Sequence, residues 1–131
     1  MDNKISILYY AKGLKKAIMD YSEFQKAKSF IVVEIIEYVP NSVVIKTIIK
    51  KITGNVTAVS VDKSEALREN ISPFDTFIQL LDGRVDVIID GECNSLEIGQ
   101  SIIVPARARN TIKANVRFKM LSTIIKSGYE D

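Results

Sequence analysis

The pattern of hydrophobic and polar residues changes near residue 42. Between Leu14 and Lys28, apolar residues recur at spacings of three and four, with lysines between them. Residues at these spacings share one face of an α-helix. The pattern predicts an N-terminal amphipathic helix of about four turns, whose apolar stripe packs on the rest of the protein or on a partner subunit. The stripe consists of Leu14, Ile18, Tyr21 and Phe24.

From residue 43 onward the apolar residues alternate with polar ones instead. The runs "VVIKTIIKK" (43–51) and "NVTAVSV" (55–61) are rich in β-branched residues, which favour strands. Asp82-Gly83 and Asp90-Gly91 separate later runs, and such dipeptides suit tight hairpins because both residues can adopt positive φ. About eight short strands separated by turns predict a compact sandwich or barrel.

Size and charge limit the classes of partner. The chain has 131 residues, of which 47% are hydrophobic and 26% charged, as expected for one globular domain. A net charge of +2 is too small to favour nucleic acid or an anionic membrane as a partner. The longest apolar stretch (30–39) contains two glutamates, so we expect no membrane span.

Cys93 is the only cysteine in the chain. No disulfide can form within the chain, which favours a reducing compartment. We recognise no secretory signal near the start. The expected location is therefore the cytoplasm, with Cys93 as an ordinary structural thiol.

Two segments carry a resemblance to a known family. "RENISPFDTFIQLLDG" (68–83) and "GQSIIVPARARN" (99–110) resemble the two motifs of the cupin superfamily. The hairpin between them, "GRVDVIIDGECNSLEIG" (83–99), is similar to that of small single-domain cupins of the cupin 2 type. The resemblance implies a mainly β fold, a cupin jelly-roll barrel over 42–131. A strand-and-helix extension over 1–41 precedes it within one globular domain.

The metal ligands of the family do not carry over. When Gly83, Gly99 and Pro105 are aligned with the family frame, polar residues stand at the usual ligand positions. Iron, zinc, nickel and copper sites use imidazole, thiolate or carboxylate ligands, whereas these residues offer neutral oxygens, and the chain has no histidine. We therefore expect no metal and no cofactor. The four positions are Asn70 and Ser72 for two histidines, Thr76 near the carboxylate, and Asn110 for the last histidine.

The same positions predict a binding pocket. Inside a mostly apolar barrel they would bind a small polar molecule, and Arg68 would recognise a carboxylate or phosphate if the ligand is an anion. In the alternative interpretation, the four side chains bond only to one another and to water. Arg107 and Arg109 are further candidates at the pocket mouth, although strand alternation relative to Asn110 turns Arg109 outward.

No catalytic residue can be assigned, because no nucleophile–base pair is evident and histidine, the most frequent general base, is absent. We leave open whether the protein is an enzyme and favour a non-catalytic module that binds a small molecule or self-associates. The resemblance also implies a homodimer. The alternative is a metal-independent isomerase, epimerase or lyase acting on a sugar or small acid, which needs a buried acid or base such as Asp75, Glu69 or a tyrosine.

Overall fold

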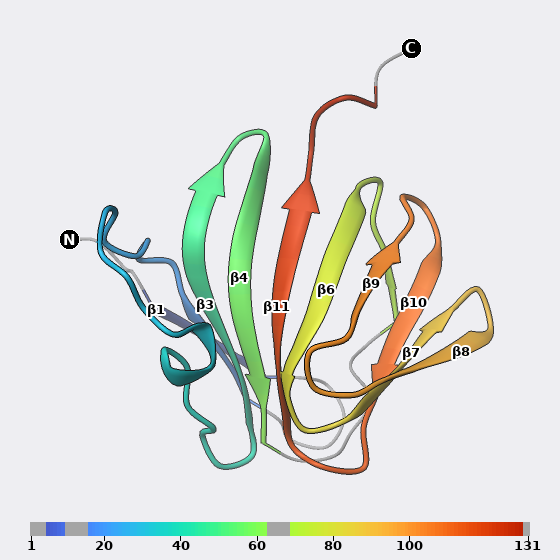
Figure 1. The fold of residues 1–131 in the computed structure, drawn as a ribbon, viewed down its shortest axis with the longest axis horizontal. Helices are drawn as coiled ribbons and strands as arrows, with labels where there is room; N and C mark the ends of the chain where they lie inside the picture. The colour runs from blue at the N-terminus through green and yellow to red at the C-terminus, as the bar shows by residue number, and fades with distance from the viewer. Residues whose placement is uncertain (1–4, 10–15, 63–68, 130–131) are drawn as a thin grey trace.

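The computed structural model describes residues 5–9, 16–62 and 69–129, which form two β-sheets packed face to face (Figure 1). The larger sheet contains, in spatial order, β1 (Ile5–Tyr9), β2 (Lys16–Asp20), β3 (Ser42–Lys51), β4 (Gly54–Val61), β11 (Phe118–Ile125), β6 (Asp75–Asp82) and β9 (Ser101–Val104). The smaller sheet contains β5 (Asn70–Ile71), β10 (Arg109–Lys113), β7 (Val85–Ile89) and β8 (Glu92–Leu96). Neighbouring strands are antiparallel except β2 and β3, which run parallel.

The main core lies between the two sheets, where alternate residues of each strand point inward. Ile78 and Leu80 of β6 meet Val85 and Val87 of β7 in this core, and all four are at most 3% exposed. Phe118 of β11 is the largest fully buried side chain among the described residues. The two buried residues of β7 alternate with Asp86 and Ile88, which are partly exposed.

The Asp90-Gly91 turn forms the hairpin that its sequence predicts. β7 and β8 pair directly on either side of it, and Ile89 lies opposite Glu92. Both turn residues have positive φ, 48° at Asp90 and 83° at Gly91. A two-residue turn of this kind matches the twist of the flanking strands.

Asp82-Gly83 does not form a hairpin, and that prediction is wrong. β6 belongs to the larger sheet and β7 to the smaller one, so the chain turns a corner between sheets here. Gly83 has a φ of 82°, and a Cβ at this position would collide with the carbonyl oxygen of Arg117 and with Phe118. The glycine is needed because the corner is crowded as well as left-handed.

The predicted α-helix between Leu14 and Lys28 is also wrong. Its first described part is strand β2, and residues 21–28 form no regular helix. Ile18 lies opposite Val44 in the β2–β3 pair, and the Phe24 N–H donates to the Ile48 carbonyl oxygen at 3.0 Å. Pairing with an existing sheet edge overrides the helical preference of a lysine-rich segment. Within the described ranges, helical structure is limited to the 3₁₀ turn η1 (Val32–Glu34), and no helix there is long and apolar enough to cross a membrane.

A second apolar cluster covers the outer face of the larger sheet. Ile36 packs there against Ile48 of β3 and Ala58 of β4, and the partly buried Phe24 and Val32 extend the cluster. Two ammonium groups hold the η1 segment in place: Lys119 Nζ donates to the Val33 carbonyl oxygen at 2.9 Å, and Lys46 Nζ donates to that of Ile35 at 3.2 Å. Figure 1 shows the segment beside β3. The η1 segment therefore covers the face of the larger sheet that points away from the main core.

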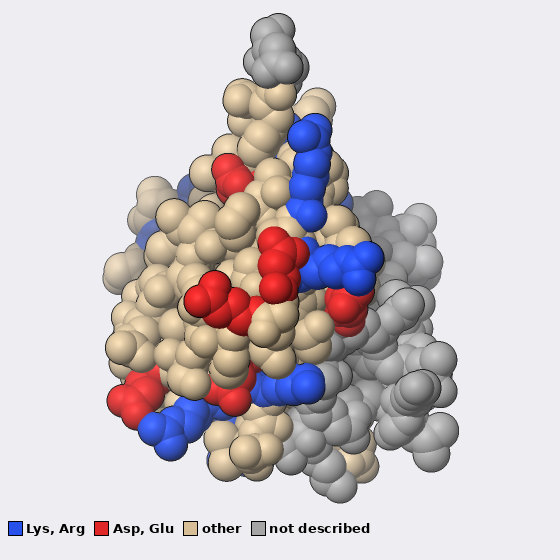
Figure 2. Space-filling view, turned by 90° about the vertical axis from the view of Figure 1, so that its right-hand side faces the viewer, with Lys and Arg blue, Asp and Glu red and all other residues tan. Residues whose placement is uncertain are grey.

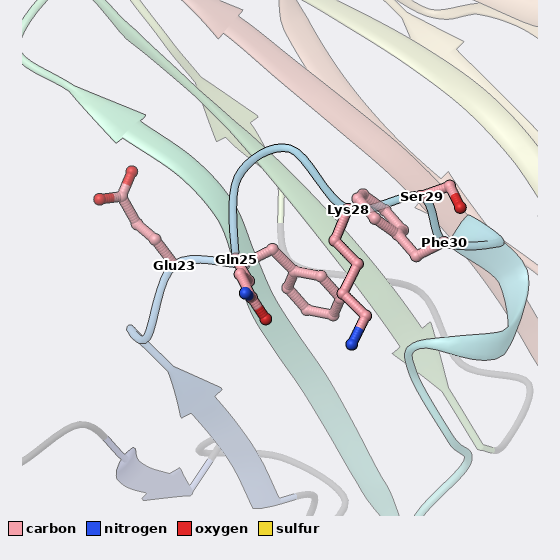
Figure 3. A pocket seen from close by; sticks show the side chains of 6 residues that line it. Glu23, Gln25, Lys28, Ser29 and Phe30 are labelled. Carbon is pink, nitrogen blue, oxygen red and sulfur yellow. The ribbon is translucent and has the colours of Figure 1, made fainter.

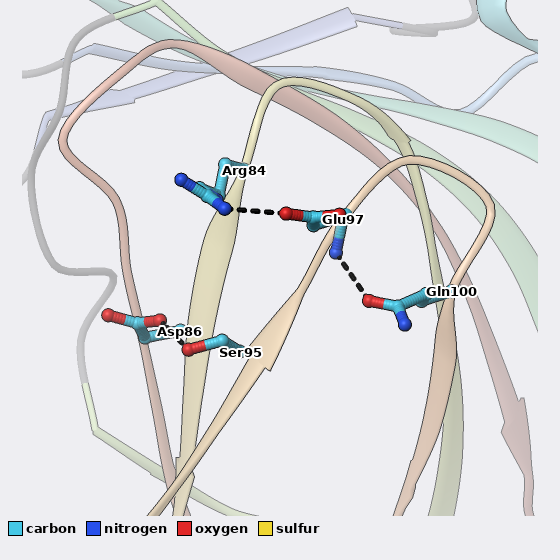
Figure 4. A network of polar contacts seen from close by, with 5 residues as sticks. All are labelled: Arg84, Asp86, Ser95, Glu97 and Gln100. Atoms are coloured by element: carbon cyan, nitrogen blue, oxygen red, sulfur yellow. Dashed lines mark hydrogen bonds and ion pairs between the residues drawn. The ribbon is translucent and has the colours of Figure 1, made fainter.

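Figure 2 shows acidic and basic side chains interspersed among uncharged residues on the side of the molecule where the β7–β8 hairpin lies. Arg84 pairs with Glu97 at 2.5 Å, and Ser95 Oγ donates to Asp86 Oδ1 at 2.6 Å (Figure 4). Exposed pairs of this kind contribute little to stability. Their position keeps charge on the solvent side of the β7–β8 hairpin.

Candidate functional site

A cavity of about 170 Å³ lies between the two sheets. The smaller sheet contributes residues from β5 and β10, and the larger sheet contributes residues from β6, β9 and β11. Its polar lining residues are neutral, and the remaining ones are aliphatic or methionine. The lining residues are Asn70, Thr76, Ile78, Val104, Asn110, Ile112, Met120, Ser122 and Ile124.

Strand register explains why these residues meet. Asn110 lies opposite Asn70 in the β10–β5 pair, and Thr76 lies opposite Ile124 of β11. Residues directly opposite each other in a sheet project from the same face. The two inner faces therefore bring Asn70, Thr76 and Asn110 together, three of the four positions singled out in the sequence.

A hydrogen bond fixes the Asn110 amide. Its Nδ2 donates to the backbone carbonyl oxygen of Asn70 at 3.1 Å. An amide has two N–H groups and one strong acceptor oxygen. One N–H and the Oδ1 of Asn110 can thus still bond a guest in the cavity.

Ser72 is not part of the cavity lining. Its Oγ accepts a hydrogen bond from the Phe74 N–H at 3.1 Å, and its carbonyl oxygen accepts one from the Arg107 N–H at 2.6 Å. A serine that bonds the backbone two residues later stabilises a turn. Pro73 lies inside this turn, which breaks the simple alternation that would have turned Ser72 inward.

The arginine candidates are placed differently. Arg107 is exposed in the loop before β10, and its φ is 69°. Arg109 is exposed on the outer face of the smaller sheet, where it borders an open depression together with Glu69 and Asp90. Neither lines the cavity. Arg68 lies outside the described residues.

The acid–base candidates also stand apart from the cavity lining. Asp75 Oδ1 accepts a hydrogen bond from the Ala106 N–H at 2.7 Å, and the Asp75 N–H donates to Tyr129 Oη at 2.7 Å. These bonds tie the 105–107 loop and the C-terminal segment to the start of β6. Glu69 is exposed at the outer depression.

Tyr38 lies near the opposite end of β6. Its hydroxyl donates to Asp82 Oδ2 at 2.5 Å. Burial and this bond to a carboxylate both disfavour the phenolate and raise the pKa of Tyr38 above its ordinary value. Arg117 lies 4.4 Å from the ring centroid. The group is a structural contact between the η1 segment and the barrel end.

Comparison with known proteins identifies the barrel. No family model matches the chain, and no curated protein sequence matches it. Among solved structures, a conserved protein of unknown function from Streptococcus pyogenes superposes with a TM-score of 0.74 at 24% identity, covering 80% of this chain and 92% of that one. A cupin superfamily protein from Desulfitobacterium hafniense gives 0.73 at 21% identity, covering 79% and 94%.

A third structure is more similar in sequence. The cupin 2 conserved barrel domain protein from Leptotrichia buccalis has a TM-score of 0.70 and 30% identity over 74% of this chain. The chain therefore has the cupin barrel fold. It spans 47% of the Leptotrichia protein, so the likeness to that cupin concerns one barrel of a longer chain.

The cavity does not fit the transition metal that the histidine motif of cupins implies. Its lining offers amide and hydroxyl oxygens from Asn70, Thr76, Asn110 and Ser122, and the thioether of Met120. Iron, zinc, nickel and copper are bound through imidazole, thiolate or carboxylate, and neutral oxygens are weak substitutes. In the part of the chain that the structure describes, no three His, Cys, Asp or Glu residues are grouped to hold a metal.

Sequence reasoning missed one polar residue that lines the cavity. Ser122 lies opposite Ile78 in the β11–β6 pair, and both line the cavity. The alternation of Met120, Ser122 and Ile124 in "MLSTII" contains this signal, since one face of β11 holds all three. The two family motifs do not include β11, so a search restricted to these motifs does not find Ser122.

Proposed function

We propose that this protein binds a small organic molecule in the cavity between its sheets, without a transition metal and without catalysing a reaction. The observation that carries the proposal is the composition of the cavity. Neutral hydrogen-bonding groups from both sheets converge inside apolar walls. Small-molecule sites typically combine an apolar lining with a few placed polar groups.

The cavity volume limits the size of the ligand. An apolar cavity of about 150 Å³ is enough to hold a benzene molecule, and this one measures about 170 Å³. We propose a ligand of about ten non-hydrogen atoms or fewer. Asn110 and Ser122 would bond its polar end, and Ile112 and Ile124 would contact its apolar part.

Whether the site can bind an anionic ligand depends on Arg68. The described lining residues are neutral, so a carboxylate or phosphate would need a cation from elsewhere. Arg68 precedes Asn70 by two positions in the chain, and the sequence pattern would place both side chains on one face if this segment is extended. We propose that a ligand anion, if the ligand is charged, pairs with the Arg68 guanidinium.

The alternative activity, a metal-independent isomerase, epimerase or lyase, requires an acid or base that reaches the ligand. Among the residues that the structure describes, those lining the cavity include no carboxylate and no tyrosine. Asp75 is bonded to the Ala106 backbone, and Glu69 lies at the outer depression. These positions support binding over catalysis.

Thermal unfolding with a ligand panel tests the proposal. The panel pairs small carboxylic acids with their primary amides, all of about ten non-hydrogen atoms or fewer. A ligand at 100 times its Kd adds about 2.7 kcal/mol of stability, which raises Tm by about 5 °C or more in a chain of this size. We expect at least one member to do so.

Variants assign that stabilisation to the cavity. Asn110→Leu and Ser122→Ala should remove it, whereas Thr111→Val, on the outward side of the same strand as Asn110, should keep it. Arg68→Gln should abolish any preference for an acid over its amide. A panel without a stabilising member, or stabilisation unchanged in Asn110→Leu, overturns the proposed function.

Two broader properties belong to the same proposal. We propose that the protein is a homodimer, as the resemblance to small cupins implies, and that it works in the cytoplasm, where its exposed thiol Cys93 stays reduced. Sedimentation velocity on tag-free protein tests the first property. A single species with the mass of one chain at micromolar concentration contradicts it.

A further inference from the structure

A second depression lies outside the barrel, in the segment between β2 and η1 (Figure 3). Its volume is about 380 Å³, and its lining consists of Glu23, Phe24, Gln25, Lys28, Ser29 and Phe30. Phe24 belongs to the outer apolar cluster with Ile36 and Ile48. The depression, here called the aromatic groove, is therefore on the other side of the larger sheet from the barrel cavity.

Two aromatic rings give the groove an apolar surface. The centroids of Phe24 and Phe30 lie 4.8 Å apart, with the rings tilted by 48°. Phe30 is 40% exposed although it pairs with a partly buried ring. A tilted pair with open ring surface can accept a third ring in an edge-to-face or offset position.

Backbone bonds hold the base of the groove on the barrel. The Phe24 N–H donates to the Ile48 carbonyl oxygen at 3.0 Å, and the Glu23 carboxylate accepts a bond from the Lys50 N–H at 2.8 Å. Ala27 has a φ of 62°, a left-handed conformation within the turn at residues 26–27. The groove is thus anchored to β3 at two successive points.

The groove lining contains one basic and one acidic side chain, Lys28 and Glu23. Figure 3 shows the Lys28 ammonium and the Gln25 amide projecting on the same side of the loop, and both residues line the groove together with Phe24. The Glu23 carboxylate is bonded to the Lys50 backbone, and this bond lowers the pKa of Glu23. Lys46 Nζ lies 5.2 Å from the Phe24 centroid and donates to the Ile35 carbonyl oxygen. Lys28 is the cation that can meet a ligand at the groove.

We propose that the aromatic groove binds a small aromatic carboxylate, with its ring against Phe24 and Phe30 and its carboxylate on the Lys28 ammonium. The groove volume falls within the range of about 300–1,000 Å³ of small-molecule sites. A neutral aromatic compound forgoes the ion pair, and an inorganic anion forgoes the ring contact. This site is independent of the barrel cavity and of the function proposed for it.

The test is an NMR titration of the full chain with 2-naphthoate at neutral pH, followed through backbone amide shifts. The neutral analogue 2-naphthalenemethanol serves as the comparison ligand. We expect saturable shifts around residues 23–30 and tighter binding of the acid than of the alcohol. Lys28→Gln should remove that preference, a change of about three-fold in Kd for an exposed ion pair. Phe30→Ser should weaken both ligands about ten-fold.

Matched controls show whether the groove itself holds the ligand. Lys26→Gln changes an exposed lysine of the same loop that does not line the groove, and it should leave both affinities unchanged. Asn110→Leu alters the barrel cavity and should also leave them unchanged. The proposal is overturned if the acid and alcohol bind equally, if Lys26→Gln acts like Lys28→Gln, or if no saturable shift occurs at residues 23–30.

Discussion

Asn110 donates its side-chain amide to the backbone carbonyl oxygen of Asn70, 3.1 Å away on the neighbouring strand. The bond ties β5 to β10 at the point where both strands line the cavity. The Asn110 side chain therefore has two roles, since it links two strands of the smaller sheet and faces the proposed ligand. In this barrel, the amide stands where the resemblance to cupins expects a metal-binding imidazole.

Asn110→Leu separates these two roles. Loss of the hydrogen bond should lower the free energy of unfolding by about 1 kcal/mol. The effect should be modest because the leucine side chain fills the space that the asparagine side chain leaves. Ligand stabilisation should be lost completely. Urea unfolding with and without a stabilising ligand measures both effects. A variant with unchanged ligand response would place the ligand elsewhere.

Gly83→Ala should destabilise the fold much more than Gly91→Ala. Both glycines have φ near 82°, but a Cβ at Gly91 meets open space, whereas a Cβ at Gly83 collides with Arg117 and Phe118. The left-handed backbone alone costs about 1 kcal/mol for alanine. The collision should bring the Gly83 variant to about 3 kcal/mol. Equal urea midpoints for the two variants would rule out a crowded corner.

Tyr38 should make stability fall in alkaline solution. Its pKa is raised above 10.0 in the folded state by burial and by the bond to Asp82. The unfolded chain therefore releases this proton first, so the contribution is complete below pH 10 and declines as pH rises above it. Tyr38→Phe should lose about 1 kcal/mol at pH 8.

Urea midpoints measured from pH 8 to pH 11 for the wild type and for Tyr38→Phe isolate the contribution of this tyrosine from every other effect of pH. The difference between the wild type and Tyr38→Phe should shrink above pH 10. A constant difference across the range is inconsistent with the raised pKa.

The sequence predicted correctly those features of the fold that depend on neighbouring residues in the chain. The alternation around Val85 and Val87 gives their burial, and Asp90-Gly91 gives a true hairpin. Asp82-Gly83 has the same local chemistry. However, β6 before it pairs with β11, and β7 after it pairs with β10, and both of these partners lie far along the chain. Which sheet a strand joins depends on those distant pairings, so the dipeptide could not reveal a corner.

The N-terminal segment failed for a related reason. The apolar spacing from Leu14 to Lys28 matches a helix, yet Ile18 pairs in a strand and Phe24 packs on the outer face of the sheet. A helix-like apolar spacing is thus divided between a strand, which contains Ile18, and the irregular segment that follows it, which contains Phe24. At the site, the family frame led to Asn70, Thr76 and Asn110, but Pro73 sends Ser72 into a turn, and Ser122 lies outside the motifs.

Metal content decides whether the cavity works without a metal. Tag-free protein, purified without chelator, is quantified for iron, zinc, nickel and copper per chain by plasma mass spectrometry, because a histidine tag would supply the missing ligands. A cavity lined by Asn70, Thr76, Asn110 and Ser122 predicts metal far below one atom per chain, and a Tm unchanged by a chelator. Near-stoichiometric metal that a chelator removes, together with a lower Tm, would contradict a metal-independent cavity.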